Sequence, residues 1–340
     1  MLLLFFIALG CTKNEKTEHI NSPVKKVQEL LLKKKYNGSF LYTKKGEKIM
    51  DLYIGYRDIA KKDTLRAEHV FYLASVSKQI TAMACLILVH KGELSLENKL
   101  SAYFPELSYA DKVSIRQMLN HSSGIPDYYG LGVYKAGMKN INVVNALLDD
   151  TELEFEPDSK FAYSNSAYVL LAMVVEKVSG KSFATFVKEE IFTPLEMESS
   201  VVFDEHASPI PIRAIGHSKQ GEKKDYAAFT TGGGGIFSQA TDLCRWERAL
   251  YTEKLIPQGL LAEAYAPLQL KDGTTSYYGM GWFVEENDPQ IVWHTGSLEG
   301  FRNLMYRNTK DQSLYLFLTN NSFENLPDLQ KEIAEIIEQP

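Results

Sequence analysis

Three short motifs follow one another along the chain, and their residue types are those of acyl transfer. They are Ser75-Val76-Ser77-Lys78, Tyr163-Ser164-Asn165 and His294-Thr295-Gly296. A serine beside a basic amine can become a nucleophile, a phenol can carry a proton to a leaving group, and a strand with a glycine lets a substrate approach closely. The combination predicts an enzyme that works through a covalent acyl-serine.

The spacing of Ser75 and Lys78 places both side chains on one face of a helix, one turn apart. The stretch from about Val76 to His90 is apolar nearly all round, which predicts a helix that is buried on most sides. Burial lowers the pKa of a lysine, so Lys78 can become neutral and take the proton of Ser75. The same spacing also occurs at Ser22 and Lys25, and an ordinary N-cap serine is the competing interpretation of Ser75.

Tyr163 and Asn165 bring a phenol and a carboxamide to positions two residues apart. A phenol near a buried cation loses its proton more easily, and a carboxamide can bind a substrate amide as donor and acceptor together. In the third motif, Thr295 can hydrogen-bond a substrate carbonyl, and Gly296 allows close approach to the backbone. Simple packing in the core is the alternative for Tyr163 and for His294.

The elements that must position these motifs are strands near both ends of the chain and helices between them. Short aromatic and β-branched segments predict strands at Ser39–Thr43, Lys48–Tyr56, Arg213–Ser218, Tyr277–Glu285, Gln290–His294, Phe301–Asn308 and Ser313–Thr319. Helical spacing predicts helices at Val76–His90, Ser114–Asn120, Val143–Asp150, Ser166–Ser179, Ser182–Ile191, Thr241–Tyr251 and Pro327–Glu338.

The fold class that follows is α+β, with one sheet built from both chain ends. We expect residues 23–92 and 206–340 to form an α/β lobe and residues 93–205 to form an inserted all-α lobe. Ser75 then lies near the meeting of the two lobes, where small-ligand sites are common.

Composition limits the classes of partner. The chain has 340 residues, 45% of them apolar and 24% charged, and a net charge of −6 that argues against a nucleic-acid binder. The seven histidines are not clustered at ligand spacing, so no metal or cofactor is predicted. Cys85 and Cys244 are expected in the core, with a disulfide between them left open. We expect a monomer that acts on a small molecule or peptide.

The N-terminal segment does not read as part of the fold. Residues 2–10 are apolar and end at Gly10-Cys11, before a polar stretch that runs to Asn21. The run is shorter than the about 20 residues that span a bilayer, and it resembles the end of a bacterial lipoprotein signal. We predict a signal and tether over 1–22, lipidation of Cys11 as the membrane contact, and a location in the bacterial cell envelope (periplasm). A plain secretory signal and a buried apolar N-terminus are the alternatives.

The three motifs and several further segments resemble the serine β-lactamase-like group, which includes class C β-lactamases, low-molecular-weight penicillin-binding proteins, D-aminopeptidases and related esterases. The motifs come in the order of that group, 88 and then 131 residues apart. The further segments are Leu119–Pro126, Phe161–Asn165, Thr193–Met197 and Gly234–Ser238. The resemblance covers roughly residues 25–335 and implies a β-lactamase/transpeptidase-like fold, with a mainly antiparallel sheet flanked by helices.

The resemblance also implies roles for the first two motifs. Ser75 is then the nucleophile and Lys78 its activator. Tyr163 exchanges protons with the nucleophile and the leaving group, and Asn165 binds the acyl side chain. The Gly232–Gly235 run is expected to shape a loop rather than to take part in the chemistry.

For the third motif, the resemblance implies that His294 and Thr295 face the substrate from an edge strand, with Gly296 between them and Ser297. The backbone N–H groups of Ser75 and Ser297 would form the oxyanion hole. The β-lactamases of the group carry a lysine where this chain has His294, and a neutral histidine is less suited to the carboxylate of a β-lactam. We therefore expect weak or no β-lactamase turnover.

The function predicted from the sequence is a serine hydrolase that cleaves an ester or amide, with a D-amino-acid peptide of cell-wall origin among the candidates. One alternative is a non-catalytic binding protein of the cell envelope on the same fold. Another is a penicillin-binding DD-carboxypeptidase, which differs from the first mainly in its substrate.

Overall fold

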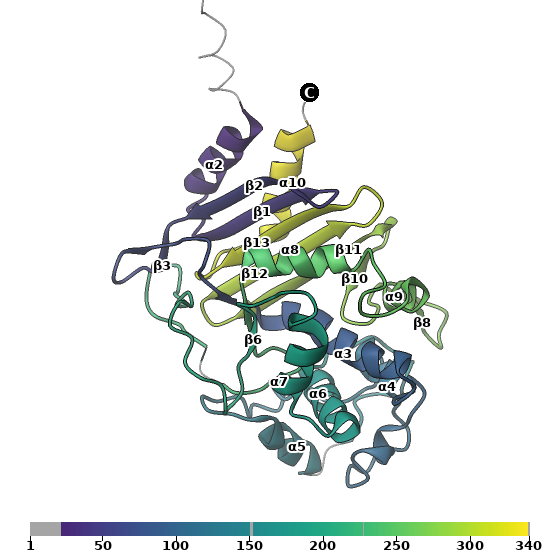
Figure 1. Ribbon diagram of the computed structural model, residues 1–340. Coiled ribbons are helices and arrows are strands. Elements are labelled where there is room, and N and C mark those ends of the chain that lie inside the picture. Colours follow the sequence, from purple (N-terminus) through teal and green to yellow (C-terminus); the bar gives the residue numbers. More distant parts are fainter. Residues whose placement is uncertain (1–21, 150–151, 227, 339–340) are drawn as a thin grey trace, which may run out of the picture.

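A six-stranded antiparallel sheet forms the centre of the molecule (Figure 1). The computed structural model describes residues 22–149, 152–226 and 228–338. The strand order is β10-β11-β12-β13-β1-β2, so strands from both chain ends share one sheet, as predicted. Their bounds are β1 Gly38–Lys44, β2 Glu47–Ile54, β10 Phe283–Glu285, β11 Asp288–Leu298, β12 Phe301–Asn308 and β13 Ser313–Thr319.

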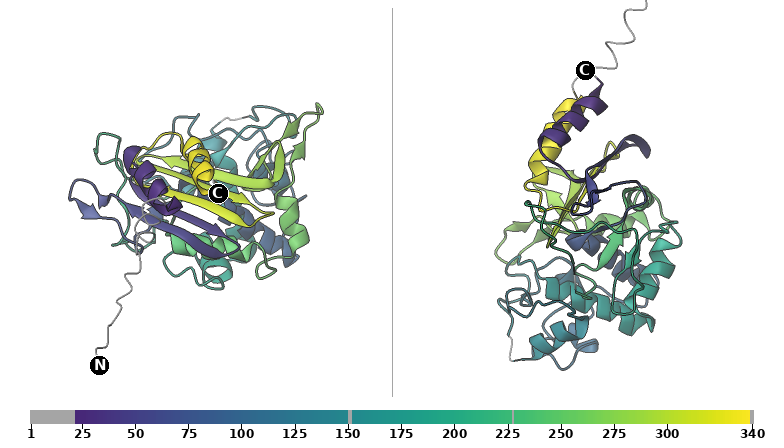
Figure 2. Two further views of the ribbon diagram at one scale, coloured as in Figure 1. Left: turned by 90° about the horizontal axis from the view of Figure 1, so that it is seen from above. Right: turned by 90° about the vertical axis from the view of Figure 1, so that its left-hand side faces the viewer.

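Two terminal helices cover one face of this sheet. Helices α2 (Pro23–Lys33) and α10 (Leu326–Glu338) lie side by side there, as both views in Figure 2 show. Leu31 of α2 and Ile333 of α10 are completely buried and belong to the same hydrophobic cluster as Phe317 of β13. This layer is separate from the candidate site, which lies on the other side of the sheet.

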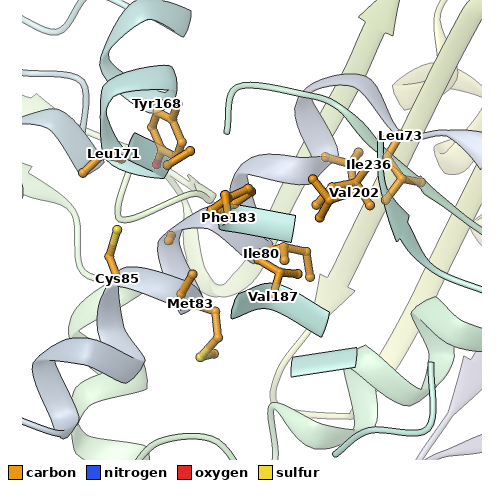
Figure 3. Close-up of a cluster of buried hydrophobic side chains, with 14 of the residues drawn as sticks. Leu73, Ile80, Met83, Cys85, Tyr168, Leu171, Phe183, Val187, Val202 and Ile236 are labelled. Carbon is orange, nitrogen blue, oxygen red and sulfur yellow. The ribbon is translucent and has the colours of Figure 1, made fainter. Parts of the chain in front are cut away.

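The opposite face of the sheet carries the larger core, at whose centre lies α3 (Lys78–His90). Helix α8 (Ala240–Ala249) packs on this face, and its Trp246 donates a hydrogen bond to Gln79 of α3. Figure 3 shows apolar side chains of α3, such as Ile80, among those of neighbouring elements. The predicted all-round burial of this helix is therefore confirmed.

The middle of the chain consists of helices joined by long loops, and it packs against the other side of α3 (Figure 1). Its helix α6 begins after the N-cap Ser164, whose side chain accepts from the backbone of Ala167, and it ends at Gly180 in a left-handed conformation. The elements of this region are η2 Leu100–Ala102, α4 Ile115–Leu119, α5 Asn140–Leu148, α6 Asn165–Ser179, α7 Phe183–Val187 and the π-helical turn η3 Lys188–Phe192.

Short pieces of sheet connect the two regions. Strands β5, β7 and β6 pair in that order, which brings the chain just before Ser75 beside the chain that follows the Gly232–Gly235 run. The remaining elements are β3 Tyr56–Asp58, β4 Asp63–Thr64, β5 Phe71–Tyr72, β6 Val201–Val202, β7 Ile236–Ser238, α9 Gln258–Ala264, β8 Leu268–Gln269 and β9 Thr275–Ser276.

Three local predictions differ from the structure. Arg213–Ser218 is not a strand. Within the described residues it forms only isolated bridges, such as that between Val70 and Arg213, and does not pair continuously with another segment. Of Tyr277–Glu285 only the last three residues form a strand, and Tyr278 makes an isolated bridge to Phe283, since Gly281 has a φ of +82° and turns the chain. The helix predicted at Ser182–Ile191 changes into the π-helical turn η3 in its second half.

Cys85 and Cys244 are buried free thiols, so the disulfide that the sequence left open is not formed. Within the described residues, no group of three His, Cys, Asp or Glu side chains gathers as metal ligands would. In the same part of the chain, no helix has the length and apolar character needed to cross a bilayer. Cys11 lies outside the described residues.

Candidate active site

Ser75 lies in the 3-10 turn η1 (Ala74–Ser77), between strand β5 and helix α3. It is partly exposed, whereas every other residue from Phe71 to Leu88 is buried. Ala74 has a φ of +50°, a strained left-handed conformation for a residue with a side chain. This bend turns the chain from strand to helix and leaves Ser75 in the wall of a cavity.

Lys78 is completely buried at the first turn of α3. Its Nζ lies 2.7 Å from Asn165 Oδ1, 2.7 Å from the carbonyl oxygen of Gly233 and 3.3 Å from Ser75 Oγ. Burial lowers the pKa of Lys78 to about 7, while the charge of Asp127 opposes part of this shift. A substantial fraction of this lysine is therefore neutral near neutral pH.

The three contacts of Lys78 suit a proton acceptor. A neutral amine has two N–H bonds and one lone pair, and the two short contacts, to Asn165 and Gly233, each take one N–H. The lone pair is then left for the longer contact, to the hydroxyl of Ser75. This arrangement suits the predicted role of Lys78 as the acceptor of the Ser75 proton.

Tyr163 lies beside the same amine, with its ring centroid 4.7 Å from Lys78 Nζ. Its hydroxyl is buried and makes no hydrogen bond with the described residues. Burial raises the pKa of Tyr163 well above its usual range, and the nearby hydroxyl of Ser75 lowers it by less. The expected easier loss of the phenolic proton is wrong, because burial raises the pKa of Tyr163 by more than the hydroxyl of Ser75 lowers it. Tyr163 is a neutral phenol that can donate a proton.

Asn165 opens helix α6 and its carboxamide is held by two partners. Its Oδ1 accepts from Lys78, and its Nδ2 donates to Asp127 Oδ2 at 2.7 Å. The backbone N–H of Asn165 donates to the same carboxylate oxygen at 2.8 Å. Asn165 also lines the cavity beside Ser75, so the sequence prediction that it contacts the substrate remains a prediction.

His294 is buried behind the site, with 1% of its surface exposed. Its Nε2 lies 3.0 Å from the hydroxyl of Tyr278, and its Nδ1 lies 2.6 Å from the carbonyl oxygen of Thr295. Burial, and then the charge of Lys78, lowers the pKa of His294 to about 3. His294 is therefore neutral at physiological pH, and it is not among the residues that line the cavity.

The strand segment after His294 runs along the site. Strand β11 is second in the sheet, but β10 pairs with it only as far as Trp293, so Thr295 to Leu298 have no strand partner on that side within the described chain. A side chain at Gly296 would overlap the carbonyl oxygen of Leu73, so glycine allows β11 to pack against η1. Ser297 lines the cavity, whereas Thr295 does not.

The cavity at Ser75 has a volume of about 350 Å³ and a tyrosine-rich wall. None of its lining side chains, among the residues described, is formally charged at neutral pH. The lining consists of Tyr72, Ala74, Ser75, Tyr128, Tyr129, Tyr163, Asn165, Thr230, Gly233, Gly234, Ser297 and Leu298. A larger hollow of about 630 Å³ lies beside η3 and contains none of the three motifs.

Several residues of the site were missed by the sequence reasoning. Tyr128 and Tyr129 form part of the wall, and Asp127 binds Asn165. Asp127 also accepts the backbone N–H of Tyr129 at 2.8 Å, an Asx turn that its position after Pro126 could have suggested. Its pairing with Asn165, 38 residues away, carried no local signal.

Comparisons with known proteins assign the family. The family model described as Beta-lactamase matches residues 26–338, and the chain belongs to this family. Penicillin-binding protein 4* of Bacillus subtilis (strain 168) is 33% identical over 332 residues, which cover 91% of this chain and 72% of that protein.

Solved structures show the same fold. A penicillin-binding protein from Bacillus halodurans has a TM-score of 0.81 and 23% identity, over 91% of this chain and 98% of that chain. D-amino acid amidase from Ochrobactrum anthropi SV3 has a TM-score of 0.80 and 22% identity, over 94% of this chain and 98% of that chain. The predicted β-lactamase/transpeptidase-like α+β fold is thereby confirmed.

Proposed function

We propose that this protein is a serine hydrolase that cleaves an ester or amide through an acyl-enzyme on Ser75. The observation that carries this proposal is the buried Lys78 amine. It is held by two neutral acceptors, its pKa is near neutral, and it contacts the hydroxyl of a partly exposed serine in a cavity. A structural lysine has no need of this arrangement.

Acylation begins when the lone pair of Lys78 takes the hydroxyl proton of Ser75. The serine oxygen bonds to the carbonyl carbon of the substrate, and the carbonyl oxygen becomes an oxyanion that the backbone N–H groups of Ser75 and Ser297 stabilise. As the intermediate collapses, Tyr163 donates its proton to the leaving oxygen or nitrogen, and the bond to the leaving group breaks. The proton on Lys78 then restores Tyr163.

Deacylation reverses these transfers with water in place of the leaving group. A water molecule loses a proton to the neutral amine of Lys78 and bonds to the acyl carbon. The bond to Ser75 breaks, and Lys78 returns the proton to the serine oxygen, which releases the acid product and the free enzyme.

The polarity of the site favours substrates without a carboxylate next to the scissile bond. His294 is neutral, and the side chains that line the cavity carry no formal charge in the part of the chain that is described. Tyrosine faces favour apolar and aromatic groups. Neutral esters and amides, including amides of D-amino acids, are the substrate class that fits. A chromogenic cephalosporin should be hydrolysed far below an enzyme-typical rate of about 10 per second.

The test is covalent labelling with a fluorophosphonate probe, followed by intact mass and peptide mapping. We expect one adduct on Ser75 and none in the Ser75→Ala variant. Ser77→Ala is the matched control, because Ser77 lies in the same turn but is completely buried. Failure of the folded protein to react would favour the alternative of a non-catalytic binding protein.

A second candidate function, penicillin binding, is favoured by the name of the Bacillus subtilis relative. Incubation with benzylpenicillin separates the two candidates. A long-lived adduct on Ser75 would support a DD-carboxypeptidase-like protein, whereas no adduct together with rapid ester hydrolysis would support an esterase or amidase.

Attachment to the cell envelope through Cys11 is part of the proposal. The supporting features are the apolar run and the cysteine that follows it. Intact mass of protein extracted from membranes should show a diacylglyceryl increment, and Cys11→Ala should abolish it. An unmodified mass would leave a secretory signal as the better interpretation.

A further inference from the structure

Asp127 contacts the site from the loop that follows Pro126, and it accepts three N–H groups. Its Oδ2 receives the backbone N–H and the side-chain Nδ2 of Asn165, at 2.8 and 2.7 Å, and its Oδ1 receives the backbone N–H of Tyr129, at 2.8 Å. The carboxylate is thus tied both to its own loop and to the start of α6. It does not line the cavity at Ser75.

These contacts fix which way the carboxamide of Asn165 points. An ionised carboxylate can only accept hydrogen bonds, so the amide nitrogen must face Asp127 and the amide oxygen must face Lys78. If the amide were rotated by half a turn, its N–H would donate to the lone pair of Lys78. That lone pair would then be occupied and could not take the proton of Ser75.

We propose that Asp127 is a positioning residue for the proposed reaction: it orients the Asn165 carboxamide and thereby keeps the lone pair of Lys78 directed at Ser75. The chain of contacts runs from the carboxylate through the amide to the amine and ends at the nucleophile. The catalytic consequence rests on the proposed function, whereas the effect on Lys78 is a property of the folded protein itself.

Apart from Asp127, the titratable groups that face Lys78 stay neutral near pH 7, so they do not obscure the titration of its amine. His121 and His294 face the amine and are neutral, because burial and the charge of Lys78 lower their pKa values. The rings of Tyr163 and Tyr168 lie 4.7 and 5.4 Å from Nζ, and burial raises the pKa of both phenols.

Asp127 is the charged group that raises the pKa of Lys78 against the effect of burial. Removal of its charge should therefore make Lys78 lose its proton at a lower pH. The titration therefore reports the charge of Asp127 at Lys78, and the labelling rate of Ser75 reports the orientation of the Asn165 carboxamide.

The experiment uses the whole protein and the variant Asp127→Asn, with two readouts. The first is the pH at which Lys78 titrates, followed by NMR with isotopically labelled lysine. The second is the rate of fluorophosphonate labelling of Ser75 across pH. In Asp127→Asn we expect a lower titration midpoint for Lys78, and a plateau labelling rate that falls by about 10-fold to 100-fold, the scale of a lost hydrogen bond to a charged group.

Two further variants control for folding. Asp158→Asn removes a carboxylate that accepts from Gln117 and Ser122 in the same helical region but contacts neither Asn165 nor Lys78. It should leave both readouts at wild-type values. Asp127→Glu keeps the charge, so it should restore the titration midpoint of Lys78 at least in part, even where the longer side chain slows labelling.

The two readouts separate this inference from the proposed function. If the wild-type protein is labelled, an unchanged plateau labelling rate in Asp127→Asn would overturn the positioning role alone, whatever happens to the Lys78 midpoint. If no fluorophosphonate labels the wild-type protein, the proposed hydrolase is overturned. An unchanged Lys78 midpoint in Asp127→Asn would then overturn the positioning role as well, and a lower midpoint would support the link from Asp127 to Lys78.

Discussion

Among the residues that the structure describes, two cations are completely buried, Lys78 in the candidate site and Arg307 in strand β12, and their surroundings differ. Lys78 is held by a hydroxyl, a carboxamide and a backbone carbonyl, all of them neutral. Arg307 lies 3.4 Å from the carboxylate of Glu247 and donates to the hydroxyl of Tyr265 at 2.9 Å.

Aromatic rings complete the environment of the arginine. Trp282 and Tyr251 lie 5.2 and 5.1 Å from its guanidinium carbon, within cation–π distance. Burial by itself lowers the pKa of Arg307, but Tyr265, Tyr251 and Glu247 outweigh it and hold the pKa above its usual range. Arg307 therefore stays charged at neutral pH.

The difference shows that the partners of a buried positive group decide whether its pKa is lowered or raised. A lysine without a directly bonded counter-ion gives up its proton easily, which suits the proposed role of Lys78 as a base. An arginine with a carboxylate and aromatic faces stays ionised, which makes it a structural connection between β12 and α8. The predictions below test this contrast.

The largest effect is expected at Lys78. Lys78→Ala should reduce the rate of Ser75 acylation by about 10²–10⁴-fold, the scale of a lost general base, while the protein stays folded. Lys78→Arg should be equally slow, because a guanidinium does not give up its proton. Stopped-flow labelling with the fluorophosphonate probe measures both. A near-normal rate in Lys78→Arg would show that a fixed positive charge, and not a base, is what the site requires.

The phenols beside the two cations provide a matched pair. Tyr163→Phe should lower steady-state ester hydrolysis by about 10²–10⁴-fold, because the proton donor to the leaving group is lost. Tyr265→Phe removes the hydroxyl that binds Arg307, so it should lower thermal stability and leave turnover per folded molecule unchanged. Equal turnover of Tyr163→Phe and wild type would remove this residue from the mechanism.

Arg307→Ala should destabilise the protein by about 3–5 kcal/mol, because it leaves the buried carboxylate of Glu247 without its partner. Urea unfolding provides the measurement. The double variant Arg307→Met with Glu247→Leu should recover much of this loss, since it removes both charges. If the double variant is no more stable than Arg307→Ala, the pair is not what stabilises this part of the core.

The smallest effect is on pH dependence. The pKa of Lys78 is lowered to about 7 in the folded protein, so the neutral, reactive form accumulates as pH rises through about 7. The acylation rate should fall about tenfold for each pH unit below this value and should be flat above it. Arg307 and His294 should not contribute, because neither titrates in this range. If the acylation rate instead stays constant down to about pH 4 and falls only below it, a carboxylate is the base.

Much of the fold could be predicted from sequence pattern alone. The helix at Val76–His90 and the strands at Phe301–Asn308 and Ser313–Thr319 appear at or within two residues of the predicted bounds. Their patterns are strong because burial imposes one period along the whole element. The strand predicted at Arg213–Ser218 is absent because a strand also needs a neighbouring strand to pair with. The sequence of the segment itself does not show whether such a neighbour exists.

The site was predictable in its residue types and less so in its arrangement. Ser75, Lys78 and Asn165 could be chosen because their spacing and order carry the chemistry, and the structure brings them into direct contact. The carbonyl of Gly233 and the carboxylate of Asp127 could not, because a backbone acceptor has no sequence signal and Asp127 meets Asn165 only in the folded chain.

The sequence by itself determined the α+β class and the spacing of Ser75 and Lys78, because these depend on periodicity and on short spacings along one chain, and its motifs carried the resemblance to the family. Only the tertiary structure decided the protonation of the groups at the site. Lys78 is brought near neutral pH, Tyr163 is kept a neutral donor and His294 is kept uncharged by burial and by partners from distant segments. The pKa of a side chain depends on the groups that surround it in space, and a linear sequence does not contain those neighbours.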